Sequence, residues 1–107
     1  MEDKFTAVYV MVRMEELKPG EEGSYEGPLA KQQEACMQYL KERADLQPEK
    51  TIEVYKNLNQ LLMDVERQRI KRLVVYKLDR LGSSQEERDG IIFELNAAGV
   101  DLLTVTE

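Results

Sequence analysis

Apolar and β-branched residues gather in four short stretches of the chain, and each stretch predicts a β-strand. They cover residues 5–12, 51–55, 73–76 and 100–105. The first stretch is almost continuously apolar instead of alternating with polar residues, which is typical of a strand buried on both faces of a parallel sheet. We therefore expect residues 5–12 to form a central strand.

Between these strands, apolar residues recur at helical spacing. The first helix is predicted from Leu29 to about Ala44, and Pro48 prevents it from continuing. Two further helices follow the repeats Leu58, Leu61, Leu62, Val65, Ile70 and Ile91, Ile92, Leu95, Ala98.

Turn and cap residues mark where some of these predicted elements begin and end. Residues 18–28 contain three glycines and two prolines, which predicts a long loop. Ser83 and Ser84 each fit the Ser-x-x-Glu pattern of a helix N-terminal cap, and Gly99 is placed as the C-terminal cap of the third helix.

The alternation of strands and helices predicts an α/β fold. We expect one domain over residues 1–107, with three layers: a mainly parallel sheet of four strands and helices on both faces. In open sheets of this kind, ligands bind beyond the carboxyl ends of the strands. Any site should therefore involve Arg13, the residues near Tyr55, and residues 77–84.

Composition narrows the possible chemistry. The chain has no histidine, which excludes histidine-dependent hydrolysis, phosphotransfer and histidine–zinc chemistry. Its single cysteine, Cys36, cannot form an internal disulfide or a CxxC pair, so we expect a reducing compartment, the cytoplasm. No apolar run is long enough to span a membrane, and residues 1–4 are too polar for a signal peptide. We predict no cofactor and no metal.

Charge is distributed unevenly. The net charge of −6 argues against a generic DNA-binding protein, but residues 66–80 hold six basic and two acidic side chains, a net +4. Residues 81–107 hold one basic and six acidic side chains, a net −5. The candidate phosphate or DNA contacts are therefore Arg67, Arg69, Lys71, Arg72, Lys77 and Arg80.

One block of sequence is specific enough to indicate a family. Residues 74–82 read Val-Val-Tyr-Lys-Leu-Asp-Arg-Leu-Gly, which resembles the serine-recombinase (resolvase/invertase) catalytic domain. Residues 9–12 are similar to the first strand of that family, residues 29–39 to its glutamine-containing first helix, and residues 97–102 to its helix-to-strand turn. The resemblance covers nearly the whole chain and implies a resolvase-like fold and an ancestral role in DNA recombination.

The resemblance also implies a serine nucleophile, and this chain departs from it. The family's Tyr-x-Arg-x-Ser pattern falls on residues 9–13, so that Tyr9 is kept, Met11 replaces an arginine and Arg13 replaces the nucleophilic serine. A guanidinium stays protonated in proteins and has no lone pair with which to attack phosphorus. Covalent catalysis at Arg13 is therefore excluded.

The rest of the implied site is only partly retained. In the family's Asp-Arg-x-x-Arg pattern, Asp79 and Arg80 match, but the last arginine falls on Ser83. A further arginine aligns loosely with Tyr55, whereas Gln32 matches the glutamine of the first helix. The vestigial pocket would consist of Tyr9, Gln32, Asp79 and Arg80.

Two functions follow from these residues. The first is a catalytically inactive recombinase domain, a pseudoenzyme or mobile-element remnant, that works as a DNA-associated or protein-interaction module. The alternative is an active serine recombinase that cleaves and exchanges DNA strands with a relocated nucleophile, Ser24.

The expected partners also follow from the family. Its members usually continue past the fourth strand into a dimerisation helix and a DNA-binding module, and neither is found in these 107 residues. We expect weak DNA binding by this chain alone, stronger binding in a longer protein or complex, and association with a second copy or another recombinase. No membrane partner is expected.

Overall fold

The computed structural model describes residues 4–13, 26–43 and 52–106. Along these ranges the elements are β1 (Phe5–Tyr9), α1 (Glu26–Glu42), β2 (Ile52–Tyr55), α2 (Leu58–Glu66), β3 (Ile70–Val75), the short 3-10 helix η2 (Leu78–Leu81), α3 (Gln85–Ala97) and β4 (Asp101–Thr104). None of the helices in these ranges has the length and apolar character needed to cross a bilayer.

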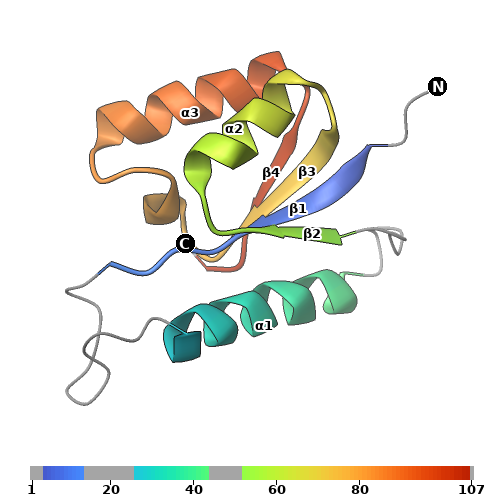
Figure 1. The fold of residues 1–107 in the computed structure, drawn as a ribbon, viewed down its shortest axis with the longest axis vertical. Helices are drawn as coiled ribbons and strands as arrows, with labels where there is room; N and C mark the ends of the chain where they lie inside the picture. Colours follow the sequence, from blue (N-terminus) through green and yellow to red (C-terminus); the bar gives the residue numbers. More distant parts are fainter. Residues whose placement is uncertain (1–3, 14–25, 44–51, 107) are drawn as a thin grey trace.

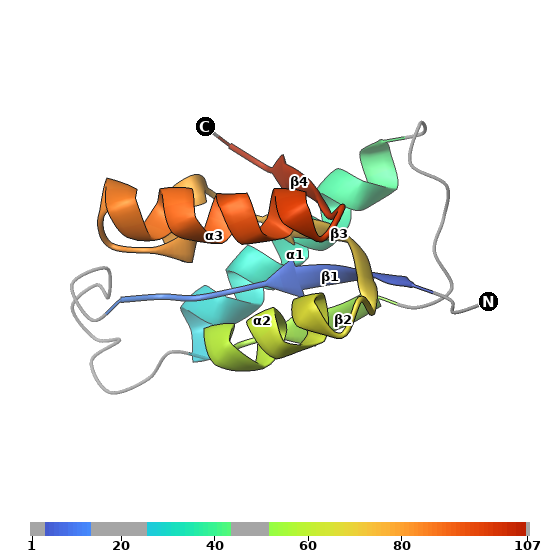
Figure 2. The same cartoon turned by 90° about the horizontal axis from the view of Figure 1, so that it is seen from above.

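The four strands form one parallel sheet in the order β2-β1-β3-β4. Helices α2 and α3 lie on one face of the sheet, and α1 lies on the other (Figure 1). Viewed from above, α1 runs beneath the strands while α3 and α2 flank β1 on the near side (Figure 2). The predicted three-layer α/β fold is therefore confirmed.

Strand order places a topological switch point at the centre of the sheet. The chain passes from β1 outward to β2, then crosses to β3 on the other side of β1 and continues to β4. The direction of winding thus reverses between β1 and β3, and such a switch point leaves room for a ligand beyond the carboxyl ends of the two strands. The segments that follow β1 and β3 meet at this place.

Each face of the sheet has its own core. Toward α2 and α3 the buried residues are Ala7, Tyr9, Tyr55, Leu61, Val65, Ile70, Leu73, Val75, Leu81, Leu95 and Val100. Toward α1 they are Val8, Val10, Cys36 and Val74. Because β1 and β3 contribute to both clusters, the apolar run of β1 and residues 73–75 of β3 are explained by burial on both faces.

Two predicted boundaries around the first strand and first helix are wrong. Strand β1 ends at Tyr9, three residues before the predicted end, because the backbone of Met11 pairs with the side chain of Gln32 instead of a neighbouring strand. Helix α1 begins at Glu26, so residues 26–28 belong to a helix and not to the predicted loop. Pro28 is tolerated there because the missing N–H of a first-turn residue has no acceptor within the helix.

The predicted place of Ile70 in the second helix is also wrong. Helix α2 ends at Glu66, Gln68 adopts a positive φ of 58°, and Ile70 opens β3 opposite Phe5. The basic residues Lys71 and Arg72 interrupt the apolar run of β3 and hide its first half from a hydrophobic pattern.

The signals for the third helix are confirmed. The Ser84 hydroxyl accepts a hydrogen bond from the Glu87 backbone N–H at 3.2 Å, which caps α3. Gly99 has a φ of +75°, the left-handed conformation expected just beyond a helix C-terminus. Strand β4 follows at Asp101–Thr104, inside the predicted range 100–105.

Candidate active site

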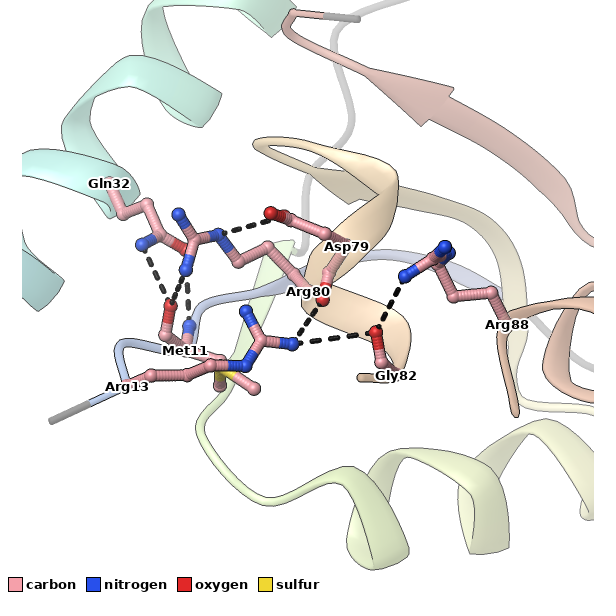
Figure 3. A network of polar contacts seen from close by, with 7 residues as sticks. All are labelled: Met11, Arg13, Gln32, Asp79, Arg80, Gly82 and Arg88. Atoms are coloured by element: carbon pink, nitrogen blue, oxygen red, sulfur yellow. Dashed lines mark hydrogen bonds and ion pairs between the residues drawn. The ribbon is translucent and has the colours of Figure 1, made fainter. Parts of the chain in front are cut away.

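The site lies where the chain leaves β1 and β3. Tyr9 pairs with Val75 at the carboxyl ends of these strands, and beyond them Met11 and Arg13 face the η2 turn. Figure 3 shows the side chains that join the two segments. Segments almost 70 residues apart in sequence are thus brought together by the sheet.

Gln32 of α1 fixes the segment after β1. Its Nε2 donates to the Met11 carbonyl at 2.8 Å, and its Oε1 accepts from the Met11 N–H at 3.1 Å. This reciprocal pair copies the bonding of a neighbouring strand, and Gln32 is only 7% exposed. The side chain therefore extends the sheet by one residue and ties it to α1.

Arg80 is turned inward. Its NH1 donates to the Met11 carbonyl at 3.2 Å, its Nε lies 3.5 Å from Asp79 Oδ1, and the residue is only 6% exposed. A buried guanidinium is costly unless it is paired and hydrogen-bonded. The retained Asp79 and the Met11 carbonyl provide that compensation.

Arg13 crosses the site and contacts the η2 turn. Its NH2 donates to the Asp79 carbonyl at 2.5 Å and lies 3.4 Å from the Gly82 carbonyl. Arg88, from the first half of α3, donates to the same Gly82 oxygen at 3.1 Å (Figure 3). The side chain at the position implied for the nucleophile therefore binds the protein's own backbone.

Gly82 permits this close arrangement. Its backbone is extended, and a Cβ placed on it would lie 2.7 Å from Glu87 Cβ and 3.2 Å from the backbone nitrogen of Arg88. Any side chain at this position would push η2 away from the first turn of α3. Ser83, where the resemblance implies an arginine, is exposed, and its N–H donates to Glu87 Oε2 at 3.4 Å.

The two tyrosines near the site belong mainly to the core. Tyr9 is buried, which raises its phenol pKa, and the nearby Arg13 charge partly offsets this effect. The Tyr55 hydroxyl donates to Asp64 Oδ2 at 2.5 Å, toward α2. Burial, together with that hydrogen bond, raises the pKa of Tyr55. Tyr55 therefore supports α2 and does not replace an arginine of the pocket.

The predicted phosphate contacts do not form one group. Arg67 and Arg69 lie 3.8 and 3.9 Å from Asp64, near the end of the sheet where Phe5 meets Ile70. Lys71 and Arg72 lie within the amino-terminal half of β3, whereas Lys77 and Arg80 follow its carboxyl end. The length of β3 separates the two groups, and their contacts with phosphate stay a prediction. Ser24 lies outside the described residues.

Sequence reasoning missed Arg88. It is the one basic residue in 81–107, and it shares a helix face with Ile91 and Leu95, which pack toward the sheet. The helical spacing of Arg88, Ile91 and Leu95 was the signal in the sequence that Arg88 points toward the sheet. In the described ranges, no group of three or more His, Cys, Asp or Glu residues is arranged to hold a metal ion.

Comparison with protein families shows which family the chain belongs to. Residues 21–107 match the family described as Resolvase, N terminal domain. The chain belongs to this resolvase family. The match extends from before α1 through β4, and it begins after Arg13, so the alignment of residues 9–13 rests on their sequence pattern alone.

Solved structures agree with this resolvase-family fold. The chain is similar to the C-terminal catalytic domain of ISC1926 TnpA, an IS607-like serine recombinase, with a TM-score of 0.73 and 17% identity over 95% of this chain and 70% of that one. It is also similar to the N-terminal catalytic domain of TP901-1 integrase, with a TM-score of 0.67 and 18% identity over 95% and 77% of the two chains. A comparison with curated proteins gave no match.

Proposed function

We propose that this chain is a recombinase-fold domain that does not cleave DNA and acts as a DNA-associated or protein-interaction module. One observation carries the proposal: Arg13, at the position implied for the nucleophile, donates to the Asp79 and Gly82 carbonyls. A group that is always protonated and already bonded to backbone oxygens cannot attack a phosphodiester.

The remaining cations support the same conclusion. Phosphoryl transfer needs positive charge aimed at the phosphorus, and loss of one such contact costs about 3–4 kcal/mol of barrier stabilisation. Two implied arginine positions hold Met11 and Ser83, and Arg80 is buried against Met11 and Asp79. The pocket is thus occupied by contacts that hold the domain together.

The experiment is a search for a covalent protein–DNA intermediate. The chain would be incubated with supercoiled DNA, quenched with denaturant, and analysed for DNA-linked protein and for nicked or linearised plasmid. We expect neither product. The Ser24→Ala variant would be run in parallel. An adduct that depends on Ser24 would establish the relocated nucleophile, and an adduct in both proteins would place the nucleophile elsewhere; either result refutes the proposal.

We further propose that residues 1–107 fold as one domain and bind DNA weakly by themselves. The net charge of −6 opposes a polyanion, and the six predicted phosphate contacts are divided between two ends of β3. A gel shift at low salt should show little retarded DNA, and unfolding should follow a single cooperative transition. Tight binding at low salt would contradict the weak-binding part.

A further inference from the structure

A large aromatic side chain lies exposed on the outer face of α3. Phe93 is 73% exposed, more than any other large apolar side chain in the described ranges. Ile92, Leu95 and Ala98 of the same segment contact the core, so packing against the sheet accounts for them and not for Phe93. One exposed apolar residue is ordinary on a protein surface, and its surroundings decide whether it marks an interface.

Gly90 leaves a gap beside Phe93. The two residues are three positions apart in α3, so they are neighbours on the helix surface, and both are exposed. A Cβ at Gly90 would meet nothing within 4 Å, so the packing of this chain does not require a glycine there. A glycine inside a helix costs stability relative to alanine. A side chain of a partner, inserted beside Phe93, would give this position a use.

Acidic side chains surround the pair. The α3 patch consists of exposed residues on the outer face of the helix: Glu86, Asp89, Gly90, Phe93, Glu94 and Ala97. It lies in the segment 81–107, which has a net charge of −5. Two α3 patches facing each other would bring like charges together, whereas a partner with cations beside an apolar group would complement the patch.

The same chain carries such a surface at the end of α2. Met63 is 44% exposed, and Arg67 follows it one turn later, donating its backbone N–H to the Met63 carbonyl. The side chains of Arg67 and Arg69 are 52% and 60% exposed. Both lie near the single buried carboxylate of Asp64, so positive charge exceeds negative charge in this group. Met63, Arg67 and Arg69 form the α2 patch.

We propose that the α3 patch of one copy of this chain binds the α2 patch of a second copy. Phe93 would contact Met63, since a thioether packs favourably against an aromatic ring. Arg67 and Arg69 would face the carboxylates of the α3 patch and set the orientation of the two copies. Because the two patches are different surfaces, each copy can bind two neighbours, and such contacts build rings or open chains.

This inference deepens the protein-interaction part of the proposed function by naming a second copy as the partner. Both α2 and α3 lie on the face of the sheet opposite α1 (Figure 1). Neither patch contains a residue of the candidate active site. The contact between copies is therefore independent of whether the chain cleaves DNA.

Analytical ultracentrifugation of the full chain, without DNA, tests the contact. From about 10 µM to about 1 mM, the range suited to a small interface, we expect the average mass to rise beyond that of a dimer. About 1 M sodium chloride should weaken the association, because it screens the charges. Phe93→Ala and Met63→Glu should each weaken it about tenfold or more. Met37→Glu changes an exposed methionine of α1, on the other face of the sheet, and should associate like the wild type.

Mixing the two weakened variants gives the sharpest test. The Met63→Glu chain keeps an intact α3 patch, and the Phe93→Ala chain keeps an intact α2 patch. An equimolar mixture should therefore form a one-to-one dimer and no larger species, because only one pair of intact patches remains.

Three results would overturn the proposal. One is a wild-type chain that stays monomeric throughout the concentration range. Another is undiminished association of either variant; in particular, Met63→Glu would still associate if two α3 patches met each other. The third is a mixture of the two folded variants that contains no dimer. If a variant fails to fold, NMR of the wild-type chain replaces it: the Phe93 ring and Met63 methyl signals should both move with concentration, and an unmoved signal from either refutes the contact.

These outcomes are separate from the test of DNA cleavage. A monomeric chain that forms no DNA adduct would refute the contact between copies and leave the absence of cleavage standing. A chain that associates and also forms an adduct would do the reverse.

Discussion

Gln32 and Met11 exchange two hydrogen bonds, 2.8 and 3.1 Å long, although they are 21 residues apart in the chain. The Met11 carbonyl also accepts a hydrogen bond from Arg80. The backbone of Met11 therefore joins the end of β1 both to α1 and to the segment after β3. These contacts are therefore part of the domain's framework, and changes in them should be measured first as changes in stability.

The Gln32→Ala variant should be destabilised by about 2–3 kcal/mol. It would lose both bonds and leave the Met11 N–H without its partner in a half-buried place. Urea unfolding followed by circular dichroism measures this loss. Gln38→Ala, on the exposed side of the same helix, is the control and should change stability by less than about 0.5 kcal/mol. Equal effects from the two variants would show that the pair with Met11 is energetically unimportant.

The Gly82→Ala variant should lose about 1–3 kcal/mol of stability. The added methyl would lie 2.7 Å from Glu87 Cβ, and η2 or α3 must move to accept it. Gly90→Ala is the matched control, because a Cβ at Gly90 meets nothing within 4 Å and alanine favours the interior of a helix. We expect that control to gain about 0.5–1 kcal/mol. If both substitutions act in the same direction, the close approach at Gly82 does not limit stability.

The Tyr55→Phe variant should cost about 1–3 kcal/mol at neutral pH. Asp64 is buried, and the substitution removes the hydroxyl that donates to its Oδ2. The control is Tyr39→Phe, which removes a half-buried hydroxyl that accepts from Arg43, and it should cost less than about 0.5 kcal/mol. Denaturant midpoints of the two variants decide the point, and similar midpoints would argue against the Asp64 contact.

Stability should fall with alkaline pH through Cys36. Burial raises the pKa of its thiol from 9.0 to about 11. Between these values the folded chain keeps a proton that the unfolded chain loses, so the free energy of unfolding decreases as pH rises. The thiol's contribution is complete below pH 9.0, and its loss amounts to about 2 kcal/mol by pH 11.

Unfolding experiments at several pH values test this effect against the Cys36→Ala variant. The variant lacks the thiol, so the stability difference between the two proteins should narrow above pH 9.0. A difference that stays constant with pH would mean that Cys36 titrates alike in the folded and unfolded chains.

Much of the fold was accessible from local pattern. The strand–helix alternation, the Ser84 and Gly99 caps and the family resemblance all describe short stretches of chain, and each was confirmed. Two of the misplaced boundaries have local causes, whereas the early end of β1 depends on the contact of Met11 with Gln32. Pro28 lies in the first turn of α1, where a proline breaks no helical hydrogen bond. Lys71 and Arg72 interrupt the apolar run of β3, so the hydrophobic pattern does not reveal where the strand begins.

The sequence by itself determined the α/β class, the resolvase family and the presence of arginine where a nucleophile is implied, because periodicity, caps and motifs are properties of neighbouring residues. Only the tertiary structure decided that Arg13 and Arg88 share the Gly82 carbonyl, that Arg80 is buried, and that Arg67 and Arg69 lie with Asp64. Those relationships depend on the order of strands in the sheet. Strand order is set by packing among residues far apart in the chain, and no local pattern records it.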